Sequence, residues 1–176
     1  DRALVAARAA GDRRRVTAVL SGAPRAALWG PSPIVRASGR CLDVVRILRM
    51  TPGNRHVEAA ALRCQAVLEA MRGRPDAARR IVADCRATLE ELGLTYELLE
   101  LAAYAGIVEL LAGDPAAAER ELRRAKEGFA SLGAEAGAAQ AAALLARALL
   151  DQGRDDEAEG ETRFAELRGG EDLKTA

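Results

Sequence analysis

The sequence has few of the residues from which many common functional sites are built. It contains one histidine, three cysteines and two lysines among 176 residues, and only 3% of its residues are aromatic. The cysteines (Cys41, Cys64 and Cys85) are far apart, odd in number and without a CxxC pair. This pattern argues against a zinc site and a disulfide scaffold, and we expect each cysteine to be a small buried residue in a reducing environment.

The chain also has no excess of either charge. Its 26 basic and 26 acidic side chains give a formal net charge of zero at pH 7. Proteins that bind nucleic acid usually carry a basic excess or a basic face. We therefore expect no direct contact with nucleic acid.

A long hydrophobic run is missing. The most apolar stretch, Ala139–Leu150, contains Arg147 and is shorter than the roughly 18 to 20 apolar residues of a membrane span. No signal peptide is recognisable, so we expect a cytoplasmic protein without a membrane partner. Because the sequence begins with Asp1 and not with Met, we expect a fragment of a longer chain. The rarity of lysine among its basic residues is typical of proteins from GC-rich bacterial genomes.

Catalytic motifs are missing as well. The sequence has no GxxxxGK[ST] phosphate loop, no GxSxG nucleophile elbow and no HExxH metal motif. A serine or cysteine nucleophile needs a base, and the only histidine, His56, stands at an expected helix start. We therefore expect no catalytic residue, no metal, no cofactor and no enzymatic activity in this chain.

The residues that are abundant favour helix. Alanine, leucine, arginine and glutamate dominate, while strand signals and Asn-Gly or Asp-Gly turns are scarce or missing. The phrases GRPDAARR, GDPAAAER and GRDDEAEG begin at Gly73, Gly113 and Gly153, which are 40 residues apart. Small residues recur at fixed distances from these glycines: Ala66, Gly106 and Ala146 seven residues before, and Ala78, Ala118 and Ala158 five residues after. Such residues let two antiparallel helices approach to roughly 8 to 10 Å.

The repeat predicts an all-α fold of stacked antiparallel helix pairs. The expected pairs are His56–Arg72 with Pro75–Leu92, Thr95–Ala112 with Pro115–Leu132, and Glu135–Gln152 with Asp155–Leu167. An irregular pair precedes them, with a second helix at Ile34–Met50 and a first helix that Ser21–Pro24 is expected to kink or break. One helix pair cannot bury its apolar face alone. We therefore expect one domain over residues 1–176, with repeats at about 12–53, 54–93, 94–133 and 134–170.

The two ends of the sequence fall inside repeats. Asp1–Ala10 is expected to be the last helix of a further unit, and Glu171–Ala176 the start of another repeat. An array that ends in mid-repeat exposes an apolar face that a cap would cover. We therefore expect either a weak end-to-end homodimer or fraying of Gly169–Ala176.

These residues resemble the tetratricopeptide repeat, a helical hairpin with small residues at its eighth and twentieth positions. With the turn glycine at position fifteen, the small residues before and after it fall at those two positions. The resemblance implies a right-handed solenoid. Two departures are clear, because the period is 40 where the family has 34, and because the usual tyrosine position holds Glu69, Glu109 and Leu149.

The longer repeats are similar to a particular group of such segments. LEAMRGRPDAARR, VELLAGDPAAAERELRRA and AALLARALLDQGRDDEAE resemble the tetratricopeptide-like segments of large bacterial signal-transduction ATPases. In that group an ATPase module follows a nucleotide-cyclase domain or accompanies a helix-turn-helix regulator. The resemblance implies a scaffold module in signal transduction or transcriptional regulation, whose parent chain carries the ATPase or cyclase activity.

In tetratricopeptide arrays the first helices of the pairs line a concave groove. By the same register, the candidate groove contacts are Arg63, Val67, Glu100, Ile107, Leu110, Gln140, Arg147 and Leu150, with Ala60, Ala70, Ala103 and Ala143 at the remaining inward positions. This strip suits a protein or peptide partner, or other domains of the same chain. Packing by the next superhelical turn would instead fill the same positions. An alternative function is a small-molecule sensor that regulates an attached ATPase, cyclase or DNA-binding output, since pockets form between helices.

Overall fold

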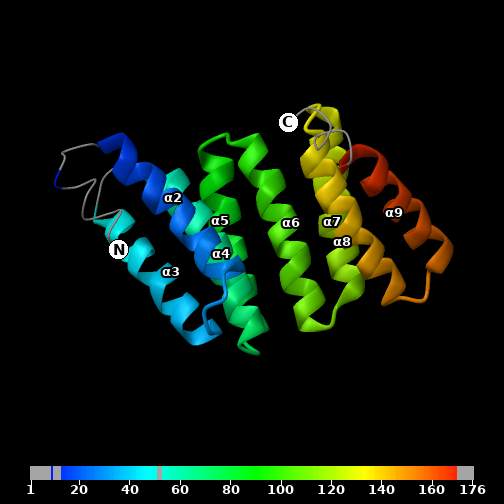
Figure 1. Ribbon diagram of the computed structural model, residues 1–176, viewed down its shortest axis with the longest axis horizontal. Coiled ribbons are helices and arrows are strands. Elements are labelled where there is room, and N and C mark those ends of the chain that lie inside the picture. Colours follow the sequence, from blue (N-terminus) through cyan, green and yellow to red (C-terminus); the bar gives the residue numbers. More distant parts are fainter. Residues whose placement is uncertain (1–8, 10–12, 51–52, 170–176) are drawn as a thin grey trace. The chain divides into compact units, whose positions relative to one another are not determined.

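The computed structural model describes residues 9, 13–50 and 53–169, and within these ranges every regular element is a helix (Figure 1). The helices are α2 (Arg13–Trp29), α3 (Ile34–Arg49), α4 (Arg55–Met71), α5 (Pro75–Glu91), α6 (Thr95–Ala112), α7 (Pro115–Ser131), α8 (Glu135–Leu150) and α9 (Asp155–Gly169). The all-α prediction is confirmed. The six helices of the three regular pairs end within one or two residues of their expected positions.

The chain divides into two compact units, residues 1–92 and residues 93–176. The described part of the first unit contains α2 to α5, and that of the second contains α6 to α9. Within each unit consecutive helices pack against each other, as in a helical repeat. That the whole chain forms one repeat domain stays a prediction.

Turns with a left-handed glycine separate consecutive helices from α3 to α9, whereas Gly30 in the turn between α2 and α3 is not left-handed. The glycines with positive φ, between 67° and 87°, recur every 20 residues at Gly53, Gly73, Gly93, Gly113, Gly133 and Gly153. At Gly113 the following residue, Asp114, donates its backbone N–H to the Glu109 carbonyl at 3.0 Å, which closes the end of α6. The Asp114 carboxylate accepts from the Ala117 N–H at 2.9 Å and caps α7, which begins with Pro115. The predicted turn chemistry is confirmed at these residues.

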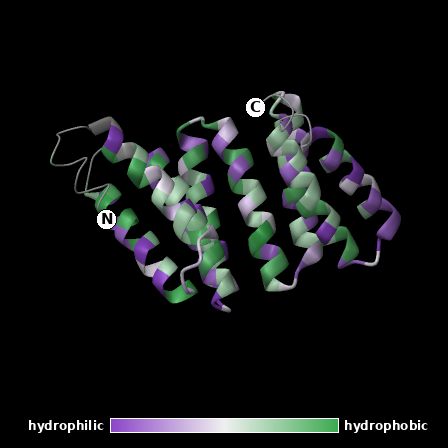
Figure 2. Cartoon of the chain, viewed as in Figure 1, coloured by the Kyte–Doolittle hydropathy of each residue, from purple (hydrophilic) through white to green (hydrophobic). Residues whose placement is uncertain are grey.

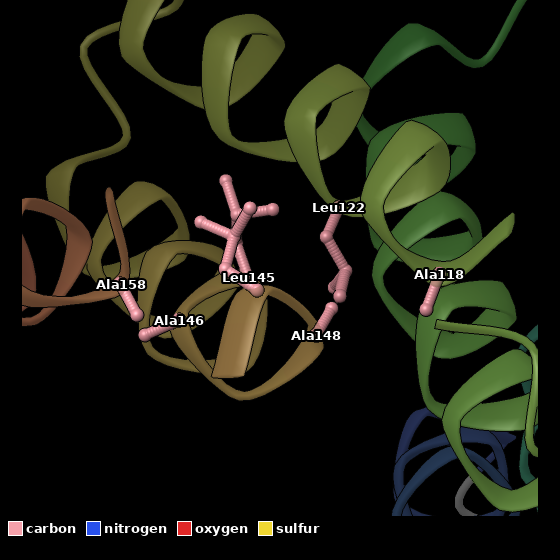
Figure 3. Packing of buried hydrophobic residues seen from close by; sticks show 7 residues of the cluster. Ala118, Leu122, Leu145, Ala146, Ala148 and Ala158 are labelled. Carbon is pink, nitrogen blue, oxygen red and sulfur yellow. The ribbon is translucent and has the colours of Figure 1, made fainter. Parts of the chain in front are cut away.

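The small residues of the repeat lie where helices cross. In the second unit, Ala118 and Ala158 are 0% and 2% exposed and belong to a core cluster with Leu122 and Leu145 (Figure 3). Because alanine projects only one carbon, the backbones approach closely and the leucines fill the space beside them. Apolar residues cover more of α6 and α8 than of α7 and α9 (Figure 2).

Of the kink or break expected at Ser21–Pro24, the break is wrong, and the kink stays a prediction. Helix α2 runs without interruption from Arg13 to Trp29 with Pro24 in its interior. An internal proline costs an isolated helix roughly 3 kcal/mol. Pro24 is fully buried, and α2 packs on both α3 and α4 through Leu20 and its neighbours. Tertiary burial therefore outweighs the local preference of the sequence.

The predictions for the two ends lie largely outside the described residues. Of Asp1–Ala10 only Ala9 is described, and it is helical. Glu171–Ala176 lies outside entirely, and Gly169 is the last residue of α9. No helix in the described ranges combines the length and the hydrophobicity needed to cross a membrane.

Candidate functional site

The groove positions of the first unit lie in its interior. Arg63 is 6% exposed and Val67 is fully buried, both on α4. Ala70 is also buried, whereas Ala60 is half-buried. These residues support the packing of the first unit and offer little surface to a ligand.

The groove positions on α6 are half-buried. Glu100, Ile107 and Leu110 all fall in this class. Leu110 packs against the core cluster of α7, α8 and α9, and Ala103 packs against a second cluster that includes Phe129. This face of α6 is therefore partly used for packing inside the second unit, where α6 contacts both α7 and α8.

The groove positions on α8 are exposed. Gln140, Ala143, Arg147 and Leu150 all face solvent, and Leu150 is 52% exposed. The opposite side of the same helix is buried, with Leu145 and Leu149 in the core. Arg147 forms an ion pair with Asp151 at 2.9 Å. The result is an exposed strip along α8 with, in order, an amide (Gln140), a small residue (Ala143), a charged residue (Arg147) and an apolar residue (Leu150) at the end of the helix.

A second feature, which the sequence analysis missed, is a cleft of about 220 Å³ in the first unit. Residues of α3, α4 and α5 line it: Arg49, Arg55, Glu58, Ala59, Leu62, Ile81, Asp84, Cys85 and Thr88. Ala59, Leu62, Ile81 and Cys85 are buried or half-buried and form apolar walls. The charged members lie more to the outside. No motif marked these residues, because they come from three helices and meet only in the fold.

Ion pairs border this cleft. Arg49 pairs with Glu58 at 2.7 Å, and Arg55 pairs with Glu91 at 2.6 Å. The hydrogen bond from Arg55 lowers the pKa of Glu91 and in turn raises the pKa of Arg55. Burial raises the pKa of the Cys85 thiol to about 12. The thiol in the cleft wall is therefore protonated at neutral pH and a poor nucleophile.

A buried polar cluster joins α3 to α4 in the first unit. Glu69 is 7% exposed and accepts hydrogen bonds from Gln65 at 2.9 Å and from Arg72 at 3.0 Å. Gln65 also donates to the Ser38 hydroxyl at 2.9 Å. Glu69 stands at the position where the resemblance leads one to expect tyrosine, and its partners explain how a carboxylate is tolerated there. These hydrogen bonds connect α3 to α4, so we assign Glu69 a structural role in the packing of the first unit.

Groups suited to metal chemistry are missing from the described ranges, where no three His, Cys, Asp or Glu side chains are placed to hold a metal ion. Cys41, Cys64 and Cys85 are buried free thiols, as expected.

No protein-family model and no curated protein matches this chain.

Proposed function

We propose that this chain is a non-catalytic interaction module, a right-handed tetratricopeptide-like solenoid that binds a protein or peptide partner or other domains of its own chain. The exposed strip on α8, formed by Gln140, Ala143, Arg147 and Leu150, supports the proposal most directly. The inward positions of α4 are buried or half-buried and those of α6 half-buried, whereas the four on α8 face solvent.

The packing of the equivalent positions on α6 indicates what kind of partner binds the strip on α8. Leu110 and Ala103 of α6 pack against clusters that include residues of α8. Their equivalents one repeat later are Leu150 and Ala143, which no described helix covers. A surface of this kind accepts an amphipathic helix through residues three and four apart.

The proposal also concerns the larger protein in which this module acts. A helical module without catalytic motifs suits a scaffold in a cytoplasmic bacterial regulator, where it couples a signal to an attached ATPase, cyclase or DNA-binding output. It contacts neither nucleic acid nor membrane, and a second copy of the chain is one possible occupant of the strip through a weak end-to-end homodimer.

Site-specific photo-crosslinking in the native host tests this proposal. A benzoylphenylalanine replaces Ala143 on the strip, and a control variant carries it at Ala116, which is exposed on α7. We expect a discrete adduct at Ala143 that is lost when Leu150→Lys is added, because a charge in place of the one large apolar side chain of the strip opposes helix packing. Equal adducts at both positions, or no adduct at either, would contradict an interaction surface on α8.

The size of the adduct identifies the occupant. An adduct of twice the chain's mass indicates the homodimer, and sedimentation of the purified chain then shows a concentration-dependent increase in mass. Another mass indicates a different protein, which mass spectrometry names.

A further inference from the structure

The cleft between α3, α4 and α5 has a counterpart in the second unit that is filled. Gly53 and Gly133 end the turns before α4 and α8 in the same left-handed conformation, 80 residues apart. In this register Arg49 corresponds to Phe129, and Asp84 corresponds to Phe164. Phe164 packs against the cluster that contains Phe129 and Ala138. Two phenylalanines thus take the positions that an arginine and an aspartate take at the cleft.

The repeat therefore leaves space at one site that it fills at the other. The open site keeps apolar walls, with Leu62 and Ile81 half-buried at its surface. A cavity of roughly 150 Å³ accommodates a benzene ring, so 220 Å³ is enough for one long side chain. An occupant needs an apolar portion to cover these walls.

The charges around the cleft indicate which polar group the occupant carries beyond its apolar portion. Arg49 is paired with Glu58 and Arg55 with Glu91. Among the described residues no cation pairs with the carboxylate of Asp84. An anion would have to break existing pairs and approach Asp84, whereas a cation would gain a partner and break none. Of the four charged residues that line the cleft, Asp84 alone has no ion-pair partner among the described residues.

We propose that this cleft binds an arginine side chain of a peptide partner. The methylene groups lie against Leu62 and Ile81, and the guanidinium pairs with Asp84. The Thr88 hydroxyl donates to the Asp84 carbonyl at 3.1 Å, so its oxygen is left to accept from the guanidinium. Arginine suits this site better than lysine, because its guanidinium is more weakly hydrated and pairs with a carboxylate through two hydrogen bonds.

This site is independent of the strip on α8, since its lining residues all belong to the first unit. The variant Leu150→Lys is therefore expected to leave it unchanged. A chain that fails the crosslinking test but binds arginine, or the reverse, distinguishes the two proposals.

A titration of the isotope-labelled chain, followed by amide chemical shifts, tests the inference. The probe is a blocked Gly-Arg-Gly peptide, and the comparison peptides replace arginine by citrulline, its neutral isostere, or by glutamate. We expect saturable shifts at Leu62, Ile81 and Thr88 with the arginine peptide and weaker binding of the other two. Added salt is expected to weaken the arginine complex, because the pair with Asp84 is partly exposed.

Three variants distinguish the contribution of the Asp84 charge to binding from that of the open space in the cleft. Asp84→Asn keeps the size of the side chain and is expected to weaken binding about fivefold, the upper range for an exposed ion pair. Asp84→Phe copies the residue of the filled site and is expected to abolish binding. Glu90→Gln removes the same charge from an exposed position on α5 outside the cleft, and we expect no change.

Several outcomes would overturn the inference. Equal binding of the arginine and citrulline peptides would remove the role of Asp84, and tighter binding of the glutamate peptide would reverse the sign of the site. Absence of saturable shifts would leave no site at all. Tighter binding of free arginine than of the peptide would make the cleft a small-molecule receptor and not a peptide site.

Discussion

At the scale of single residues, the second unit shows how one atom sets the distance between helices. A Cβ added at Gly106 on α6 would lie 2.4 Å from the Cγ atom of Leu122 on α7. Leu122 is 0% exposed and cannot move aside without disturbing the core. In the 40-residue register, the other pairs have alanine at the position of Gly106 and a smaller residue at the position of Leu122. In order along the chain the combinations are Ala66 with Val82, Gly106 with Leu122, and Ala146 with Thr162.

Because the large Leu122 side chain occupies the space next to Gly106, we expect Gly106→Ala to be destabilising. Alanine gains up to about 1 kcal/mol of helix propensity over glycine, but overpacking against Leu122 costs roughly 1 to 3 kcal/mol. We expect a net loss of about 1 kcal/mol in the free energy of unfolding, measured by urea denaturation. Gly160→Ala on α9 is the matched control, because its Cβ meets nothing within 4 Å, and it is expected to stabilise.

A second substitution tests the cause of the loss. Adding Leu122→Val to Gly106→Ala recreates the combination found at Ala66 and Val82. We expect the double variant to be more stable than the sum of the two single effects predicts. Strict additivity, or a Gly106→Ala variant as stable as the Gly160→Ala control, would show that the close approach to Leu122 is not the constraint.

The buried thiols are expected to be unreactive in the folded chain. Burial raises the pKa of Cys41 to about 12, with a smaller contribution from Cys64, and the pKa of Cys85 reaches about 12 for the same main reason. The thiolate attacks disulfide reagents, so at pH 8 labelling is expected to be about a thousandfold slower than for an exposed cysteine. Absorbance after addition of a disulfide reagent measures this. Fast labelling of either thiol without denaturant would contradict the burial.

At the scale of elements, ion pairs connect the second helices of neighbouring hairpins in the second unit. Glu119 and Lys126 of α7 pair with Arg154, just before α9, and with Glu161 of α9, both at 2.7 Å. The Lys126 ammonium also lies 4.6 Å from the centre of the Phe164 ring. Exposed pairs contribute up to about 1 kcal/mol each, and a network holds better than isolated pairs. This network orients α9 on the surface of the unit.

Glu119 gives this contact a pH dependence. Hydrogen bonds from Gln152 and Arg154 hold its pKa below the usual 4.5, although burial acts in the opposite direction. A lowered pKa means that the stabilisation is complete above pH 4.5 and is lost as the pH falls through the pKa of the folded state. Glu119→Gln is therefore expected to lower stability at pH 7 by up to about 1 kcal/mol and to lose part of the acid dependence.

Thermal unfolding from neutral to acidic pH measures both effects. Glu127→Gln is the control, since Glu127 is exposed on the same helix and is not a member of any of these pairs. If the two variants had the same melting temperature at every pH, the network would make no contribution to stability.

The sequence predicts the features that depend on local signals, but not those that depend on tertiary packing. The turn glycines and the small residues act locally and at fixed spacing, so helix ends from α4 to α9 follow from them within two residues. The uninterrupted helix at Pro24 could not be predicted in this way. The cost of proline in a helix is a local effect, whereas the burial of α2 that offsets this cost is a tertiary effect. The sequence did not predict the cleft at Arg49 and Asp84 either. The cleft is open because these two positions hold smaller or polar side chains where the second unit has Phe129 and Phe164.

At the scale of the whole molecule, the same register position has different roles in different repeats. Val67 is fully buried, Ile107 is half-buried, and Arg147 is exposed, although all three share one position in the 40-residue repeat. Register therefore predicts which residues are equivalent but not what covers each of them. The candidate groove could be assigned to the first helices of the pairs, and only the structure distinguishes buried from exposed members.

A repeat fold depends on every close crossing, so one enlarged residue should disrupt a whole unit. Ala118 is 0% exposed in the core of α7, α8 and α9, where a tryptophan has no space (Figure 3). We expect Ala118→Trp to cost about 3 kcal/mol or more in the free energy of unfolding, measured by helical circular dichroism during urea denaturation. Ala116→Trp adds the same side chain to an exposed position of α7 and is expected to change stability by less than about 0.5 kcal/mol. Identical midpoints for the two variants would contradict the packing of α7 at Ala118, and with it the assignment of a repeat built on small residues.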